Sequence, residues 1–241
     1  MSRFWKISLG LVLFAACLAG GAWIDTPLAR WLDPEPIPGD LMRTIRFMEI
    51  YAHGFGVLLI LLTVYTLDER GWRPLPRLLS MSFLPGLAVN MVKLTLARYR
   101  PNEYRYVQKP YSFEETFVGW FPTFNLPEEI ATDHTIQSFP SAHTAMAVGL
   151  AMGLSIVYPK GRKLFLFFAV LSGMQRLTDH AHFLTDVIVG AGIGFCVSKL
   201  LTRESGWLER TWRKWESGPE TASEAVTIPE STDEMTDRRA A

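Results

Sequence analysis

The chain has 241 residues, of which 49% are hydrophobic, and its 24 basic and 24 acidic residues give a formal net charge of +0. The length suits one domain, and the balanced charge excludes a global basic field, so we expect no nucleic-acid partner. Both cysteines, Cys17 and Cys196, lie inside apolar runs, so we expect small buried hydrophobic residues rather than a disulfide or a zinc site.

The apolar residues are gathered in six blocks, and most of these approach the ~20 residues that a helix needs to cross a bilayer core. Blocks such as Gly56–Leu62 have no polar face, which the alternative of a soluble amphipathic bundle would require. We therefore expect an all-α, polytopic membrane bundle with six transmembrane helices and an extracytoplasmic loop between the third and fourth. The expected spans are Ile7–Ile24, Ile50–Leu67, Leu75–Ala97, Ala142–Tyr158, Leu164–Leu177 and Phe183–Leu201.

The first span has an alternative interpretation. Arg3 and Lys6 precede an apolar run, as in a signal peptide, and Phe14 to Cys17 approximates a lipoprotein cleavage box. Because the apolar run continues to Ile24, we expect a first span that is not cleaved.

The distribution of Lys and Arg predicts the orientation. With the N-terminus inside, the basic residues near the ends of the spans fall mainly on the inner side, as the positive-inside rule requires. The segment Arg98–Phe139 then falls outside. The inner cations would be Arg3, Lys6, Arg70, Arg73, Arg77, Lys160, Arg162, Lys163, Arg203, Arg210, Arg213 and Lys214.

Two segments lie outside the apolar blocks. The loop 101–139 is long and aromatic, which is typical of a functional loop that packs near headgroups. Residues 218–241 are rich in Glu, Thr and Ser, so we expect a disordered cytoplasmic tail. The predicted organisation is a membrane domain over 1–217, with loop 101–139 over the active site, followed by this tail. The aromatic residues of the loop are Tyr104, Tyr106, Tyr111, Phe117, Trp120, Phe121 and Phe124.

The first of three polar motifs closes the third block. Lys93 and Arg100 are seven residues apart, which on a helix would place them about 20° apart on one face. Pro101 would then end the helix. Such cations can be snorkelling anchors, but Arg100 also suits bidentate contact with phosphate oxygens, and Lys93 supplies a point charge.

The second motif, Pro140 to His143, opens the fourth block. A helix N-terminus presents unpaired N–H groups to an anion. Ser141 can alternatively be a simple N-cap. His143 lies one turn into an apolar helix, where an imidazole needs a polar partner or a chemical role.

The third motif lies between the fifth and sixth blocks. His182 and Asp186 are four residues apart, so on a helix the carboxylate would lie beside the ring and fix its tautomer. The alternative is a structural pair that caps the helix. Arg176 adds a third cation, and His180, two residues from His182, would point to a different face.

Together the three motifs resemble those of the type 2 phosphatidic acid phosphatase superfamily. That family combines Lys, six residues and Arg-Pro, then Pro-Ser-Gly-His, then Ser-Arg, five residues, His, three residues and Asp. The resemblance extends from about the second span to the sixth. The matching residues are Lys93, Arg100, Pro101, Pro140, Ser141, His143, Arg176, His182 and Asp186.

Two positions depart from the family pattern. Ala142 stands where the family usually has Gly, and Gln175 stands where it usually has Ser. If position 142 required a positive φ, Ala would cost about 1 kcal/mol. These departures bear on efficiency or substrate choice more than on the reaction.

The resemblance implies a metal-independent hydrolase with no cofactor. His182 would attack phosphorus and form a phosphohistidine, Asp186 would orient it, and His143 would protonate the leaving oxygen and then activate water. The groups that would hold the phosphoryl oxygens are Lys93, Arg100, Arg176, Ser141 and the backbone near Ala142.

The expected function is hydrolysis of a lipid phosphate monoester or pyrophosphate at the outer face of a bacterial inner membrane, with the substrate and bulk lipids as partners. Phosphatidic acid, phosphatidylglycerophosphate, a polyprenyl pyrophosphate and a lipid A–like glycolipid all remain open as substrates. One alternative is a phosphoryl or headgroup transferase that uses an alcohol acceptor. Others are a weakly active lipid-binding relative and a soluble vanadate-dependent haloperoxidase, against which the six spans argue.

Overall fold

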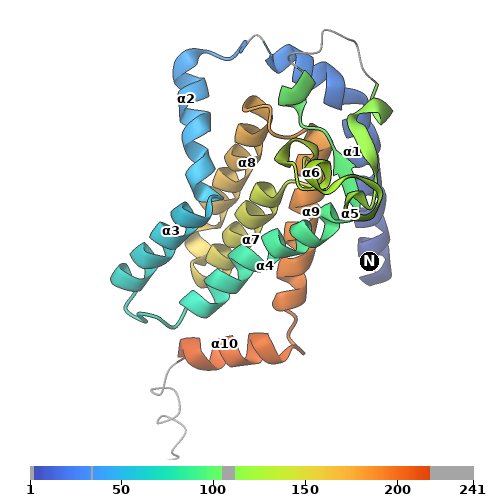
Figure 1. Ribbon diagram of the computed structural model, residues 1–241. Helices are drawn as coiled ribbons and strands as arrows, with labels where there is room; N and C mark the ends of the chain where they lie inside the picture. The colour runs from blue at the N-terminus through green and yellow to red at the C-terminus, as the bar shows by residue number, and fades with distance from the viewer. Residues whose placement is uncertain (1–2, 34, 105–111, 218–241) are drawn as a thin grey trace, which may run out of the picture.

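The computed structural model describes residues 3–33, 35–104 and 112–217 (Figure 1). Tyr106, Tyr111 and the expected tail lie outside these ranges. The described chain is mostly helical, as the apolar blocks predict. Its longer helices are α1 (Arg3–Leu32), α2 (Gly39–Phe47), α3 (Gly54–Leu67), α4 (Leu75–Lys93), α7 (Ala142–Val157), α8 (Arg162–Thr178), α9 (Leu184–Leu201) and α10 (Trp207–Ser217).

Helix α7 forms the centre of the bundle and packs against α4, α8 and α9, while α1 packs against α9. The apolar core includes Leu78 from α4, with Leu150 and Leu154 from α7. Close packing depends on Gly149, since a Cβ at this position would lie 1.9 Å from the carbonyl oxygen of Met81. The α4–α7 contact therefore tolerates no larger side chain there.

Two described helices, α4 and α9, are long and apolar enough to cross a membrane. A third span results if α2, the 3₁₀ turn η1 (Met48–Tyr51) and α3 count as one broken span bent by 72°. Helix α7 is apolar but shorter. The six-span arrangement therefore stays a prediction. Many large apolar side chains on the outer faces of these helices are exposed, such as Phe55, Leu87 and Leu200.

The expectation of free but buried cysteines is wrong in part. Neither Cys17 nor Cys196 forms a disulfide, but both are exposed, on α1 and α9. Each of these apolar helices has one face that does not pack against the rest of the protein, and the cysteine lies on that face. An apolar sequence neighbourhood therefore does not imply burial in this fold.

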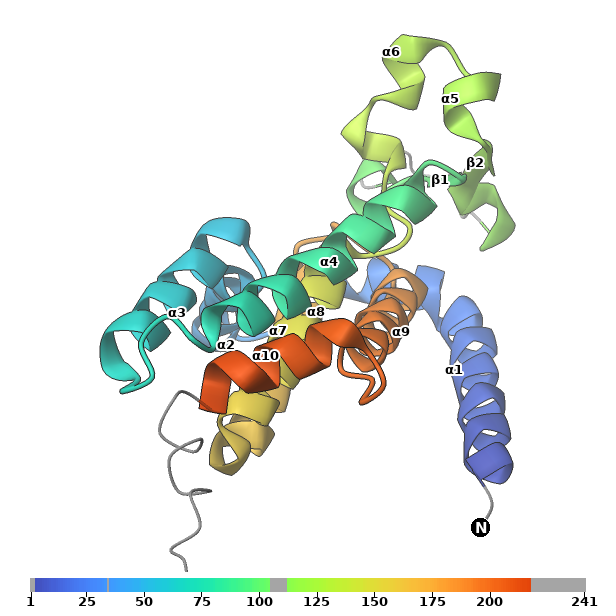
Figure 2. The same ribbon diagram turned by 90° about the horizontal axis from the view of Figure 1, so that it is seen from below.

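The segment between α4 and α7 forms a small lobe beyond the end of α4, to one side of the bundle (Figure 2). Strands β1 (Leu96–Arg98) and β2 (Phe117–Trp120) pair antiparallel and add a small sheet to an otherwise mostly helical chain. The lobe also holds the short helices α5 (Pro122–Asn125) and α6 (Glu128–Ala131). Three 3₁₀ turns complete it: η2 (Pro101–Tyr104), η3 (Glu114–Thr116) and η4 (His134–Ile136).

Helix α10 lies across the opposite end of the bundle (Figure 1). Arg77 of α4 is only 1% exposed and forms ion pairs with Glu209 and Glu216 of α10, at 2.6 Å and 2.7 Å. Its guanidinium also lies 5.2 Å from the ring centroid of Trp212. Arg77 is therefore a buried structural residue, although its sequence position suggested an ordinary inner cation. A 3₁₀ turn, η5 (Pro159–Gly161), joins α7 to α8 at this end.

Candidate active site

The first motif is not helical throughout, which corrects the expected helix to Ala97. Helix α4 ends at Lys93, and Leu94 is its C-cap. The chain then enters β1, because Ala97 and its neighbours pair with β2. Arg100 follows this strand, and its backbone N–H donates to the carbonyl of Thr135 in η4 at 2.9 Å. The two cations are thus brought together by a strand and a loop, not by one helix face.

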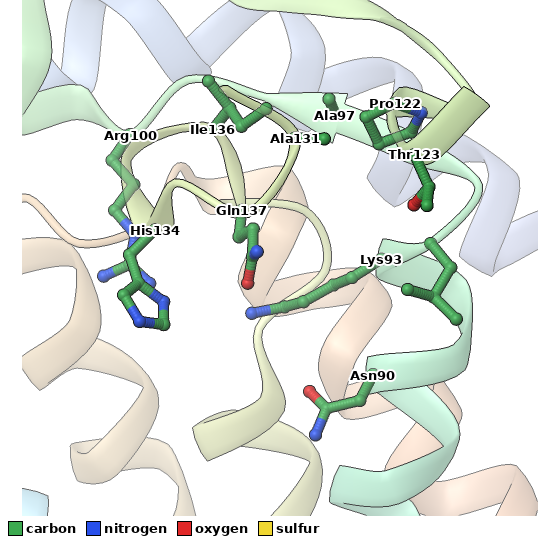
Figure 3. Close-up of a pocket in the computed structure, with 11 residues that line it drawn as sticks. Asn90, Lys93, Ala97, Arg100, Pro122, Thr123, Ala131, His134, Ile136 and Gln137 are labelled. Carbon is green, nitrogen blue, oxygen red and sulfur yellow. The ribbon is translucent and has the colours of Figure 1, made fainter. Parts of the chain in front are cut away.

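Lys93 and Arg100 both line a pocket of about 370 Å³ beneath the lobe. The side chains of Lys93, Arg100, His134 and Gln137 point toward one another there (Figure 3). Its remaining described lining residues include Asn90 and Thr123. Polar groups therefore surround the two cations on the lobe side.

A second hollow, of about 360 Å³, lies on the adjoining surface of α4 and α7. It is lined by apolar side chains that include Phe83, Leu87 and Met146, and it shares Asn90 with the polar pocket. The two hollows therefore meet at one residue near the end of α4.

The second motif opens α7 as predicted. Ser141 is the N-cap, and its hydroxyl accepts hydrogen bonds from the backbone N–H and the side chain of Thr144. Its own N–H donates to the carbonyl of Asp186 at 3.0 Å. Gly190 permits this contact, since a Cβ there would lie 2.4 Å from the carbonyl oxygen of Ser141. Ser141 therefore joins α7 to α9, and a phosphate contact through it stays a prediction.

Ala142 is the first residue of α7 and is not among the described residues with positive φ. The usual Gly of the family is therefore not needed for backbone conformation here. His143 follows it, and its ring centroid lies 6.4 Å from that of His53, the N-cap of α3. His53 was not predicted as a site residue.

The third motif places its pair together, but not on one helix. Phe183 is the N-cap of α9, so His182 lies in the preceding turn and Asp186 in the first turn of the helix. His182 Nδ1 is 3.7 Å from Asp186 Oδ2, which is longer than a hydrogen bond. Among the described residues, this nitrogen has no hydrogen-bond partner. The imidazole and carboxylate are therefore adjacent but not yet bonded.

The carboxylate of Asp186 is bound by other groups. Oδ1 accepts from the guanidinium of Arg98 at 2.5 Å, and Oδ2 accepts from the hydroxyl of Ser138 at 2.6 Å. Oδ2 also accepts from the backbone N–H of Phe183 at 2.8 Å. Arg98 and Ser138 were not predicted, although Arg98, the last residue of β1, stands two positions before Arg100 in the sequence.

Gln175 has a clear structural role. Its side-chain oxygen accepts from Arg176 Nε at 2.6 Å, and its nitrogen donates to Asp179. Arg176 also forms an ion pair with Glu49 of η1 at 3.1 Å. The residue that replaces the usual Ser thus holds the third cation in place.

Electrostatic interactions couple the three motifs. The charges of Arg176, His182 and Lys93 act on His143, and those of Lys93 and Arg100 act on His182. Burial, followed by the nearby charge of Arg176, lowers the pKa of Arg100. The structure therefore assembles all three motifs at one end of the bundle.

The imidazole of His182 stays neutral down to a lower pH than a free imidazole does. Burial is the largest cause that lowers the pKa of His182, and the cations Lys93 and Arg100 lower it further. The carboxylate of Asp186 acts in the opposite direction. A neutral imidazole is the form that can act as a nucleophile or base.

His180 differs from His182 in its backbone. It has φ of 53°, and its carbonyl accepts from the N–H of Asn102 at 3.0 Å. It therefore shapes the turn before α9, and its side chain is buried.

A family model described as the PAP2 superfamily matches residues 75–210, more than half of the chain. Over 115 residues the chain is 27% identical to a lipid A 1-phosphatase of Rhizobium johnstonii, a match that covers 48% of this chain and 41% of the relative. A lipid A 1-phosphatase of Rhizobium etli is 27% identical over 109 residues, covering 45% of this chain and 40% of the relative. The matches thus span well under two thirds of each relative.

The crystal structure of Aquifex aeolicus LpxE is similar with a TM-score of 0.49 and 19% identity, over 73% of this chain and 93% of that one. The family match includes the residues of all three motifs, which the structure gathers at one end of the bundle. The resemblance drawn from the motifs is thus confirmed, and the chain belongs to the PAP2 superfamily.

Proposed function

We propose that this protein is an integral membrane phosphatase that removes phosphate from a lipid through a phosphohistidine intermediate. The observation that carries the proposal is the gathering of three cations around an imidazole–carboxylate pair. Lys93 and Arg100 interact electrostatically with each other and with the His182–Asp186 pair. The third cation, Arg176, acts on Arg100 and on His143. Such a site attracts a phosphate dianion and offsets the charge that develops in its transfer.

The chemistry proceeds in two displacements. Because Nδ1 of His182 faces Asp186, the other nitrogen, Nε2, attacks phosphorus. The bond between phosphorus and the lipid oxygen breaks, and that oxygen takes a proton from protonated His143. Water then attacks the phosphohistidine and gives a proton to His143, which releases inorganic phosphate and restores both histidines.

The two adjoining hollows support a lipid as the substrate. The polar pocket beside Lys93 and Arg100 suits a headgroup, and the apolar hollow that meets it at Asn90 suits an acyl chain. Exposed aromatic residues on the lobe, Trp120 and Phe124, are 66% and 86% exposed and suit a position among lipid headgroups. Since two relatives are named lipid A 1-phosphatases, a glycolipid phosphate is the first substrate to test.

We also propose that the site faces outward from the cytoplasm, because basic residues gather at the far end of the bundle. Lys160 and Lys163 lie at the junction of α7 and α8, and Arg210 and Lys214 lie on α10. The positive-inside rule assigns that end to the cytoplasm. Labelling of a single cysteine at Thr123 by an impermeant reagent in intact cells tests this, and labelling only after lysis would contradict it.

Metal independence is part of the proposal, because side-chain cations supply the positive charge. Within residues 3–33, 35–104 and 112–217, no group of three or more His, Cys, Asp or Glu side chains could hold a metal ion. Activity should persist in EDTA. Activity that is lost in EDTA and restored by Mg²⁺ would contradict this assignment.

The deciding experiment measures phosphate release by the purified protein in detergent. The panel contains a lipid A 1-phosphate, phosphatidic acid, phosphatidylglycerophosphate and a polyprenyl pyrophosphate, with the His182→Ala variant as control. We expect release from at least one lipid and none with the variant. Transfer to an added alcohol without phosphate release would favour the transferase, and no reaction with any lipid would contradict the proposal.

A further inference from the structure

A buried chain of charged groups extends from the proposed catalytic pair into α1. The side chains of Arg98, Asp25 and Asp186 are all 0% exposed. Arg98 binds Asp186 through one terminal nitrogen at 2.5 Å and Asp25 through the other at 2.7 Å. One arginine is therefore shared between two carboxylates from opposite ends of the sequence.

Further hydrogen bonds fix the geometry of this chain. Thr185, next to Asp186, donates its N–H to Asp25 at 2.9 Å and its hydroxyl to the same carboxylate. Arg98 Nε donates to the hydroxyl of Thr116 at 2.9 Å. Each nitrogen of the Arg98 guanidinium therefore donates a hydrogen bond. The partners are Thr116 in η3, Asp186 in α9 and Asp25 in α1.

Aromatic rings surround the guanidinium. Its central carbon lies 5.0 Å, 4.7 Å and 4.1 Å from the ring centroids of Phe113, Phe117 and Phe183. Such a setting excludes water and strengthens the electrostatic interactions of the charge. Arg98 lines neither hollow described above, so its effect on substrate would be indirect.

The effect passes through Asp186 to His182. Oδ1 of this carboxylate is bound by Arg98, and Oδ2 lies toward Nδ1 of His182. A guanidinium on one oxygen fixes the carboxylate plane and offsets part of its negative charge. Both the orientation of the imidazole and its basicity therefore depend on Arg98, and through it on Asp25.

We propose that Arg98 and Asp25 are positioning residues for the reaction, acting on His182 through Asp186. This inference rests on the proposed phosphatase function. It assigns a role in the active site to α1, which lies outside the segment matched by the family model. Neither residue lines the polar pocket beside Lys93 and Arg100.

The first test removes the charge of Arg98. Arg98→Met keeps an unbranched apolar side chain among the three rings but leaves Asp186 without its cation. The uncompensated carboxylate should raise the pKa of His182, so the acid limb of kcat/KM should move up by about one pH unit. A misplaced imidazole should lower kcat by about 10²-fold with little change in KM, and Arg98→Lys should recover part of the loss.

The second test is Asp25→Asn, which keeps the shape and removes a negative charge. Asp25 and His182 line the same small cavity, so this change should lower the pKa of His182. The acid limb should then move to lower pH, opposite to Arg98→Met. This isosteric variant also decides the matter if Arg98→Met fails to fold.

The other charged groups near His182 are Lys93, Arg100, His143 and Asp186, and all remain in these variants. The matched control is Arg77→Met, because Arg77 is an equally buried arginine paired with two carboxylates at the far end of the bundle. It should lower stability without moving the pH profile.

Opposite shifts in the two site variants, with none in the control, would support the inference. An acid limb that stays in place in Arg98→Met and Asp25→Asn, while the folded fraction alone changes, would overturn it. Failure of the proposed function looks different, since wild-type protein would then release no phosphate or His182→Ala would retain activity.

Discussion

Each end of the bundle buries an arginine between two carboxylates, Arg77 at the far end and Arg98 at the lobe end, but the lobe end also holds cations without such a match. At the far end, Arg77 is matched by Glu209 and Glu216, and these contacts attach α10 to α4. At the lobe end, Lys93 and Arg100 have no carboxylate within 4.0 Å among the described residues. Matched buried charge is typical of a structural junction, whereas an excess of cations beside a neutral imidazole indicates a site for an anion.

The largest expected effect of breaking the lobe end is complete loss of activity in His182→Ala. The reason is that the nucleophile itself is removed. Quenching with alkaline detergent, in which the P–N bond of a phosphohistidine survives, should trap a labelled phosphoenzyme in the wild type and none in the variant. His180→Asn is the control, because Asn tolerates the positive φ at this position. An inactive His180→Asn beside an active His182→Ala would reverse the assignment.

His143→Ala should come next, with kcat on a lipid phosphate lowered by about 10²–10⁴-fold through loss of a general acid. The loss should be far smaller with p-nitrophenyl phosphate, whose leaving group needs little protonation. Rates on both substrates with the same preparation check this. Equal losses on the two substrates would instead make His143 a phosphate-positioning residue.

Arg100→Ala should lower kcat/KM by about 10²–10³-fold, the usual cost of removing one group that stabilises developing charge. Arg100→Lys should recover only part, because it lacks the bidentate fork. Exposed Arg210 of α10 is the comparison, and Arg210→Ala should leave the rate as it is. A large loss of kcat/KM in Arg210→Ala would contradict the assignment of catalysis to the lobe end alone.

Arg77→Met should affect stability and not chemistry. Removing one partner from a buried ion pair costs about 3–5 kcal/mol, and Glu209 would keep only its ion pair with the exposed Arg213. Denaturant unfolding in detergent measures the loss, and activity per folded molecule should be retained. A variant of normal stability would mean that α10 is attached by apolar contacts alone.

The smallest effect is in the pH profile of the wild-type enzyme. Because burial lowers the pKa of His182, the imidazole stays neutral below its usual value of about 6.5. Activity should therefore fall only as the pH drops through this lowered pKa, and the acid limb of kcat/KM should lie below about 6.5. An acid limb above that value would indicate that Asp186 outweighs burial.

Sequence patterns predicted which residues lie near one another but not the secondary structure that brings them together. Motif spacing identified Lys93, Arg100, His182 and Asp186 correctly as neighbours, yet helical geometry was the wrong reason. Leu94 ends α4 and the next residues form a strand, because pairing with a distant strand outweighs local helical preference. Short-range periodicity contains no information about such a partner.

The residues missed by sequence reasoning act over long separations. Asp25 is a lone carboxylate at the end of an apolar run, and only the fold brings it to Arg98, 73 positions away. His53 and His134 likewise reach the site from separate elements. A single sequence offers no signal for such long-range contacts. Catalytic motifs can be identified from sequence because the chemistry fixes the spacing of their residues.

The bond between Thr185 and Asp25 joins residues 160 positions apart, in α1 and α9. Since α1 leaves the ribosome before α9, the carboxylate of Asp186 gains this support only after both helices have been made. A nascent chain that ends after the first two motifs would lack His182 itself, and one that ends at His182 would lack the carboxylate that orients it. The proposed lipid hydrolysis would begin only after the helices have assembled, so partly made protein would leave the surrounding membrane unaltered.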